Sequence, residues 1–254
     1  MSNRGIFYRD PSTPIYRRTI RVSTPSVGPI HHVADRKIIT PGNGTSITAT
    51  WPTNLADGDL VIAIIVARVG GGSGMTITSS AMTEIGESTG GNTTMQVFYH
   101  RSDGTETGTF TITLGGSDSY SGFTARVSGA ENPATTAPTV TYAYADVDEG
   151  QGDPPNHTFT SGDYLIFAAA GKRDDGLLDG AEPSGYRNIS SSRTASVPCA
   201  MGFGDKRVSN AASENPGTIG WTGIGDWSAV TLAIPGATAI PPTGPIIVFG
   251  GFGA

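Results

Sequence analysis

Short apolar or alternating runs recur along the middle of the chain, and they predict β-strands rather than helices. Turn-forming residues such as Asp-Gly-Asp at 57–59 and the glycines at 70–72 stand between these runs, as is typical of strand connections. No stretch of about 12 residues or more follows a 3.6-residue period. The predicted strands cover residues 45–51, 60–68, 95–100, 109–114, 123–127, 139–144, 164–170 and 230–234. The pattern therefore predicts an all-β body.

The elements of the first half of the chain recur in the second half in the same order. Gly-Asp-Leu-Val-Ile-Ala at 58–63 corresponds to Gly-Asp-Tyr-Leu-Ile-Phe at 162–167, an offset of 104 residues. Asp-Ser-Tyr-Ser at 118–121 corresponds to Gly-Asp-Trp-Ser at 225–228, an offset of 107 residues. Such regular spacing indicates an internal repeat.

This repeat predicts a jelly-roll-like β-sandwich built from two similar halves, at about residues 45–133 and 154–236. Neither half buries its inner face alone, whereas two halves that face each other form one sandwich. Two small sandwiches in tandem are the alternative. We favour a single body over residues 40–236, preceded by an extended N-terminal arm (1–39) and followed by an apolar C-terminal tail (237–254).

Charge is distributed unevenly over these three parts. The 254 residues include 16 Lys and Arg against 22 Asp and Glu, a formal net charge of -6. Residues 1–39 hold 7 basic and 2 acidic side chains, which gives +5 and leaves -11 for the rest of the chain. Prolines at 11, 14, 25 and 29 interrupt the arm, so we expect it to be extended.

The two ends are the predicted partner-binding segments. Arginine side chains pair well with carboxylates, and an extended arm can add a strand to a sheet edge. The uncharged tail offers apolar side chains to a pocket on a neighbouring subunit. The predicted contact residues are Arg4, Arg9, Tyr16, Arg17, Arg18, Arg21 and Arg36 in the arm, and Ile246, Ile247, Val248 and Phe249 in the tail.

Composition excludes several classes of protein. A single cysteine, Cys199, excludes an intramolecular disulfide framework and a multi-cysteine zinc site. The longest apolar run, near residues 60–67, is far shorter than the roughly 20 residues of a membrane helix. The N-terminus shows no apolar signal segment, so we expect synthesis in a cytoplasm and no membrane partner. The acidic body and dispersed arginines also argue against nucleic-acid binding.

The search for catalytic chemistry predicts neither an enzyme nor a cofactor. No nucleophile elbow, phosphate loop or zinc-protease motif is present. Cys199 begins an apolar run, which favours a buried hydrophobic role, and the four isolated histidines fit structural roles. Trp51, Trp221 and Trp227 could form a sugar-stacking platform, but the repeat favours the core for them.

Two acidic clusters offer an alternative chemistry. Clustered carboxylates bind calcium when they supply six to eight oxygens, and a pair about 5–9 Å apart serves glycoside hydrolysis. Neither cluster has EF-hand spacing, so we predict no metal site, with calcium as the alternative. The clusters are Asp146, Asp148, Glu149 and Asp153, and Asp174, Asp175, Asp179 and Glu182.

Several segments together resemble jelly-roll-like structural proteins of tailed bacteriophages. The segments are residues 58–63, 97–101, 103–106, 108–112, 120–123, 162–165 and 227–230. They mark strand starts, turns and core aromatics, and they carry no catalytic residue. One departure is the Thr-Ser-Ser-Ala-Met-Thr segment at 78–83, where such domains often have Pro-Ala-Gly-Trp.

The resemblance implies a non-enzymatic virion protein, and we expect a capsid decoration or head-attached surface protein anchored by its termini. Its expected partners are the major capsid protein or tail and connector proteins. Many copies on a lattice would gain avidity, and a homo-oligomer is expected, a trimer suiting three-fold lattice sites by analogy. The alternative is a tail-fibre or receptor-binding module that recognises host surface polysaccharide.

Overall fold

A computed structural model describes residues 32–69, 75–90, 92–174, 182–194 and 197–237. These residues form eleven strands and no helix, which confirms the predicted all-β class. The part of the chain that the structure describes accordingly contains no helix able to cross a membrane.

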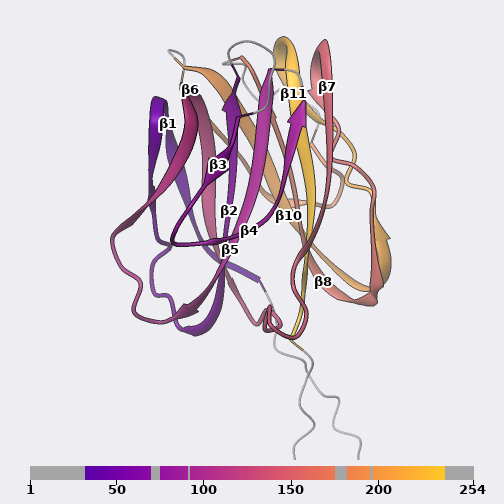
Figure 1. Cartoon of the computed structure of the whole chain (residues 1–254). Coiled ribbons are helices and arrows are strands. Elements are labelled where there is room, and N and C mark those ends of the chain that lie inside the picture. The colour runs from indigo at the N-terminus through magenta and orange to yellow at the C-terminus, as the bar shows by residue number, and fades with distance from the viewer. Residues whose placement is uncertain (1–31, 70–74, 91, 175–181, 195–196, 238–254) are drawn as a thin grey trace, which may run out of the picture.

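The strands form two antiparallel sheets that pack face to face (Figure 1). The first sheet has the order β1-β6-β2-β5-β4, with the short β3 paired to β6, and the second has the order β7-β11-β8-β10-β9. The first contains β1 (His32–Thr50), β2 (Asp57–Arg68), β3 (Ile77–Thr78), β4 (Thr83–Gly90), β5 (Thr93–Asp103) and β6 (Thr109–Ser128). The second contains β7 (Thr139–Gly152), β8 (His157–Lys172), β9 (Arg187–Thr194), β10 (Val197–Glu214) and β11 (Ile219–Pro235).

Each half of the chain forms one sheet, and apart from β3 the two sheets share the same topology. The corresponding strands are β1 and β7, β2 and β8, β4 and β9, β5 and β10, and β6 and β11. In the sandwich, β1 lies near β9 and β4 lies near β7, so corresponding strands occupy opposite edges. This arrangement is that of two copies related by an approximate two-fold axis, and it confirms a sandwich built from two similar halves.

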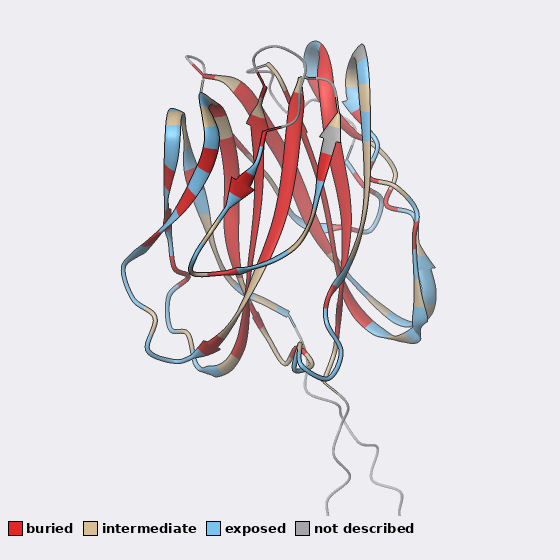
Figure 2. Cartoon of the chain, viewed as in Figure 1, coloured by how far each residue is buried: buried red, intermediate tan, exposed pale blue. Residues whose placement is uncertain are grey.

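The main core lies between the two sheets (Figure 2). Phe123 of β6 and Phe203 of β10 stack across it, with ring centroids 3.9 Å apart. The sheets also approach closely at Gly171 of β8, where an added Cβ would lie 2.7 Å from the side chain of Val66. One core shared by both halves makes a single sandwich, not two in tandem.

The β1–β6 pair folds back over the outer face of the first sheet. The register of this pair shifts before Gly42 and again after Gly44. The part of the pair beyond the second shift covers Val61 and other buried residues of β2. The Thr124 hydroxyl donates to the Thr50 carbonyl across this fold, at 2.8 Å. In the second half, the Thr231 hydroxyl donates to the Pro155 carbonyl in the same way, at 2.6 Å. The two halves therefore share individual hydrogen bonds as well as strand order.

Several predicted boundaries were wrong. Residues 32–39, which we assigned to the arm, form the beginning of β1 and pair with residues 122–128 of β6. The arm therefore ends before His32. The charged residues at 35–37 led to the wrong boundary, because they resemble the rest of the basic arm and hide the pattern of an edge strand. The predicted strands at 109–114 and 123–127 belong to the one strand β6. The pattern also missed β3, β4, β9 and most of β10, whose residues are largely polar or glycine-rich.

Candidate functional site

The described chain begins and ends at the same end of the sandwich, which we call the terminal pole. His32 pairs with Ser128 at the end of β6, and Ala130, just beyond β6, pairs with Gly236. The Ala237 N–H donates to the Gly129 carbonyl at 2.9 Å. Figure 1 shows both ends of the described chain at this pole. The first and last described residues, His32 and Ala237, therefore lie at one pole of the body.

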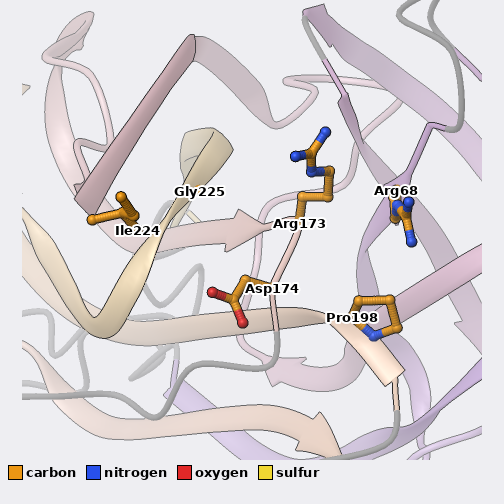
Figure 3. A pocket seen from close by; sticks show the side chains of 6 residues that line it. All are labelled: Arg68, Arg173, Asp174, Pro198, Ile224 and Gly225. Atoms are coloured by element: carbon orange, nitrogen blue, oxygen red, sulfur yellow. The ribbon is translucent and has the colours of Figure 1, made fainter.

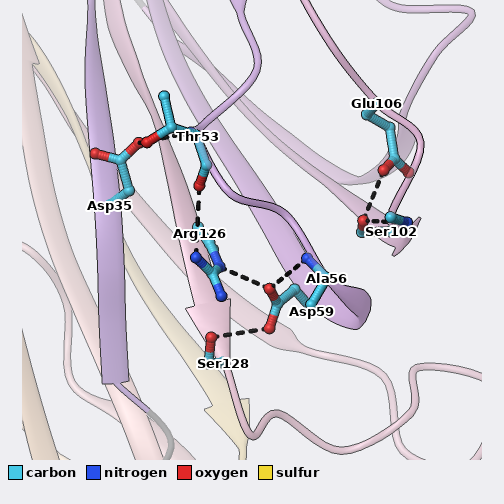
Figure 4. A network of polar contacts seen from close by, with 9 residues as sticks. Asp35, Thr53, Ala56, Asp59, Ser102, Glu106, Arg126 and Ser128 are labelled. Atoms are coloured by element: carbon cyan, nitrogen blue, oxygen red, sulfur yellow. Dashed lines mark hydrogen bonds and ion pairs between the residues drawn. The ribbon is translucent and has the colours of Figure 1, made fainter.

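A buried carboxylate organises the terminal pole (Figure 4). Asp59, in the Gly-Asp motif that opens β2, is 6% exposed. Its Oδ2 accepts from Arg126 Nε at 2.6 Å and from the Ala56 N–H at 2.9 Å. Its Oδ1 accepts from Ser128 Oγ at 2.8 Å. These bonds tie the loop before β2 to the end of β6, and so fix the chain where residue 129 leaves the sheet.

Glu106 organises the neighbouring loop between β5 and β6. Ser102 Oγ donates to Glu106 Oε2, and His100 Nε2 lies beside Oε1, each at 2.6 Å. Burial alone would raise the pKa of Glu106, but hydrogen bonds from Ser102, His100 and the Asp103 N–H lower it from 4.5 to about 2. Ser102 contacts the carboxylate and not the imidazole, so this geometry lacks the serine–histidine contact that activates a nucleophile.

Replacement of Glu106 by glutamine should lower the free energy of unfolding at neutral pH by about 1.5–3 kcal/mol, because charge-assisted hydrogen bonds are lost. The pKa of Glu106 is lower in the folded state than in the unfolded state, so its stabilisation is complete above about pH 4.5 and declines as the pH falls towards 2. Urea unfolding across this range should show wild type and variant converging. Glu84→Gln, at an exposed position on β4, is the control. A constant difference between wild type and E106Q down to pH 2 would contradict this account.

Arg36 is the predicted arm residue that the structure describes, and it lies in β1 within the body. Its guanidinium donates to the carbonyl of Asn188 in β9 and lies 5.3 Å from the centroid of the Phe203 ring. Burial lowers the pKa of Arg36, and the nearby buried Asp205 partly opposes this. Arg36 thus joins the edges of the two sheets. Its role in partner binding stays a prediction.

The other predicted contact residues lie outside the described residues. In the arm these are Arg4, Arg9, Tyr16, Arg17, Arg18 and Arg21, and in the tail they are Ile246, Ile247, Val248 and Phe249. Their roles likewise stay predictions.

The single cysteine and the three tryptophans lie in the interior. Cys199 is fully buried, and its burial raises the pKa of the thiol, so the sulfur stays protonated. Trp51, Trp221 and Trp227 are all buried. These positions confirm the predicted core roles.

His157, at the start of β8 in the second sheet, is buried. The ring nitrogens of His157 contact the hydroxyls of Thr139 and Thr141 at 2.8 and 2.6 Å, and burial lowers its pKa. The predicted structural role of this histidine is confirmed.

The acidic clusters fall only partly within the described residues. Asp175 and Asp179 lie outside them, as do the side chains of Asp148 and Glu149. Among the described side chains, no group of three or more His, Cys, Asp or Glu residues is arranged to hold a metal ion. Asp174 instead lies 3.4 Å from Lys172 Nζ.

A polar cleft of about 430 Å³, whose lining residues are drawn in Figure 3, lies at the end of the sandwich opposite the terminal pole. We call this end the cleft pole; Arg68 ends β2 there, and Arg173 directly follows the end of β8. In Figure 3, Ile224 is at one side of the cleft, Arg68 and Pro198 are at the other, and Arg173 and Asp174 are between them. The sequence offers no signal for this site, because its residues come from four separate segments and form no motif.

Lys172 fixes the wall of the cleft from inside. This side chain is fully buried, and its Nζ donates to the Thr222 carbonyl at 2.9 Å and lies 5.8 Å from the centroid of the Trp221 ring. Gly223, which follows Thr222, has a φ of 79°, in the left-handed region that glycine adopts without strain. Lys172 therefore holds the part of β11 that carries Ile224, where the pairing with β7 shifts register between Gly220 and Gly225.

The fold and these two poles define an all-β protein made of two repeated half-sandwiches, with both described chain ends at one pole and a polar cleft at the other. Comparisons of the chain with protein-family models, with curated proteins and with solved structures give no match.

Proposed function

We propose that this chain is a non-enzymatic structural protein of a bacteriophage virion, a capsid decoration or head-attached surface protein anchored by its terminal segments. The observation that carries the proposal is the terminal pole: His32 and Ala237 both lie there. Two segments that leave the body at one place can hold the same underlying surface. The opposite pole then faces outward.

The charge of the chain supports attachment through the arm. Residues 1–31 hold five arginines and one aspartate, whereas residues 32–254 hold 11 basic and 21 acidic side chains, a net charge of -10. An arm of this kind suits an acidic groove on a major capsid protein or on a tail or connector protein. Weak contacts of one copy become strong when many copies or a homo-oligomer bind a lattice.

The described nucleophile candidates support the non-enzymatic part of the proposal. The Cys199 thiol is buried and donates to the Val66 carbonyl at 3.6 Å. Ser102 Oγ is bound to a carboxylate. Each of these groups stabilises the sandwich.

Deletion of residues 1–31 should abolish attachment, lowering retention on particles by at least about 100-fold, because the avidity of the arm is lost. The deletion stops before His32, so β1 keeps all of its pairs with β6. The measurement is co-sedimentation of labelled protein with purified phage heads and, separately, with tails. Thermal melting should show that the deleted protein keeps its fold.

A second variant separates charge from length. Full-length chain with Arg4, Arg9, Arg17, Arg18 and Arg21 changed to glutamine keeps the arm but removes its positive charge. Its attachment should fall as well, and the attachment of wild type should weaken with added salt. Full retention of the 1–31 deletion on both heads and tails would overturn the proposal.

The cleft favours a second candidate function, recognition of a host surface polysaccharide by a tail-fibre or receptor-binding module. The cleft lies at the pole opposite the described chain ends, and its volume is within the range of small-molecule sites, roughly 300–1,000 Å³.

A further inference from the structure

We propose that the cleft binds a carboxylate-bearing sugar, a uronic acid unit, with Arg68 and Arg173 holding its carboxylate. This inference gives a ligand class to the second candidate function and rests on that function only for the biological source of the sugar. The cleft itself is independent of the terminal pole and of whatever the arm contacts.

Each of the two arginines lies near an aspartate of the body but still has N–H groups that can donate hydrogen bonds to a ligand. Arg68 Nε is 3.9 Å from Asp118 Oδ1, and one terminal nitrogen of Arg173 is 3.5 Å from Asp226 Oδ2. Both distances are beyond a normal hydrogen bond. Arg68 Nε is buried and has no hydrogen-bond partner. The two side chains are each 38% exposed, so a ligand in the cleft can reach their terminal nitrogens, although not the buried Nε of Arg68.

The backbone of Arg173 is fixed beside Asp226. Its backbone N–H donates to the Asp226 carbonyl at 3.1 Å, and the Asp226 side chain accepts in turn from the amide of Asn92. The planar guanidinium of Arg173 matches a carboxylate with two parallel hydrogen bonds.

The charge balance around the cleft favours a single negative charge. Among the described residues, Arg68, Lys172 and Arg173 supply three positive charges, and Asp118, Asp174 and Asp226 supply three negative charges. Charges that cancel in this way attract a phosphate dianion only weakly. It does suit a ligand whose one carboxylate meets the arginines while the rest of the molecule is neutral.

The other walls of the cleft match the remaining surfaces of a sugar acid. Ile224 is 60% exposed and offers an apolar face for the C–H side of a pyranose ring. Asp174 lies between Ile224 and the arginines (Figure 3). Its carboxylate, which contacts Lys172, gives this wall of the cleft a polar group beside the apolar face of Ile224.

The test is calorimetric titration of the full-length chain with D-glucuronate and D-galacturonate, with D-glucose and inorganic phosphate as comparison ligands. At least one uronate should bind saturably in about the millimolar range. Glucose and phosphate should bind at least about tenfold more weakly. Arg68→Gln and Arg173→Gln should each weaken uronate binding by about tenfold or more, since each removes charge-assisted hydrogen bonds.

Two variants control the test. Arg207→Gln removes an exposed arginine of β10 outside the cleft and should leave uronate binding unchanged. Arg68→Lys keeps the charge without the planar fork and should restore part of the affinity. Absence of saturable uronate binding would overturn the proposal, as would equal binding of phosphate or glucose, or unchanged affinity in R68Q and R173Q. The 1–31 deletion should bind uronate normally, so failure of this site is distinct from failure of attachment.

Discussion

Replacement of Phe123 by alanine is expected to lower the free energy of unfolding by about 3–5 kcal/mol. Phe123 is fully buried in the core between the sheets and stacks on Phe203, with a further ring contact to Phe167 at 6.0 Å. These partners come from the second half of the chain. The substitution therefore leaves a cavity between the halves, where the surroundings collapse poorly because strands hold them on both sides.

Equilibrium unfolding in urea measures this effect, and Ile38→Ala is the control. Ile38 lies on β1 and is 45% exposed, so its truncation should change stability by less than about 0.5 kcal/mol. A typical domain has only about 5–15 kcal/mol of stability, so F123A should unfold at a much lower urea concentration. If the two halves were separate domains, F123A would give two transitions. One transition, shifted as a whole, is the expected result.

The sequence contained most of the information on the repeat. The Gly-Asp motif and the apolar run after it mark β2 and β8 in the two halves, since the part of each central strand that follows the motif is buried on both faces and nearly all apolar. Strands of that kind can be predicted from composition alone. Edge strands do not: β9 is Arg-Asn-Ile-Ser-Ser-Ser-Arg-Thr, and its pairing with β10 depends on the rest of the sheet.

Features that depend on contacts between distant segments were beyond the sequence. Arg36 appeared to be one more arginine of a basic arm, yet its partner Asn188 is 152 residues away. The cleft likewise joins Arg68, Arg173 and Ile224, none of which stands in a recognisable motif. A single sequence without geometry offers no signal for either, because local spacing reports local structure only.

The two copies of the Gly-Asp motif show how one repeated element acquires different roles. In the first half Asp59 is buried and receives hydrogen bonds from Arg126, Ser128 and the Ala56 N–H. In the second half Asp163 is exposed, and its carboxylate accepts from the Asn210 N–H at 3.2 Å. The motif is the same, but the desolvation and the partners are not. Stability should therefore depend on the first copy and hardly on the second.

Asp59→Asn should accordingly destabilise the protein by about 3 kcal/mol, at the lower end of the roughly 3–5 kcal/mol cost of breaking a buried ion pair, because Arg126 keeps some access to water. Asp163→Asn is the matched control and should cost less than about 1 kcal/mol. Urea unfolding at neutral pH measures both.

Arg126→Met and the double variant D59N/R126M complete a thermodynamic cycle. The double variant should be more stable than the sum of the single effects predicts, because it no longer leaves one buried charge without its partner. Additive effects would show that Asp59 acts through its bonds to Ser128 and Ala56 alone. Equal effects of D59N and D163N would contradict the asymmetry itself. In that case the backbone pairing of residues 129–131 with 235–237 would stabilise the terminal pole, and the Asp59 carboxylate would not.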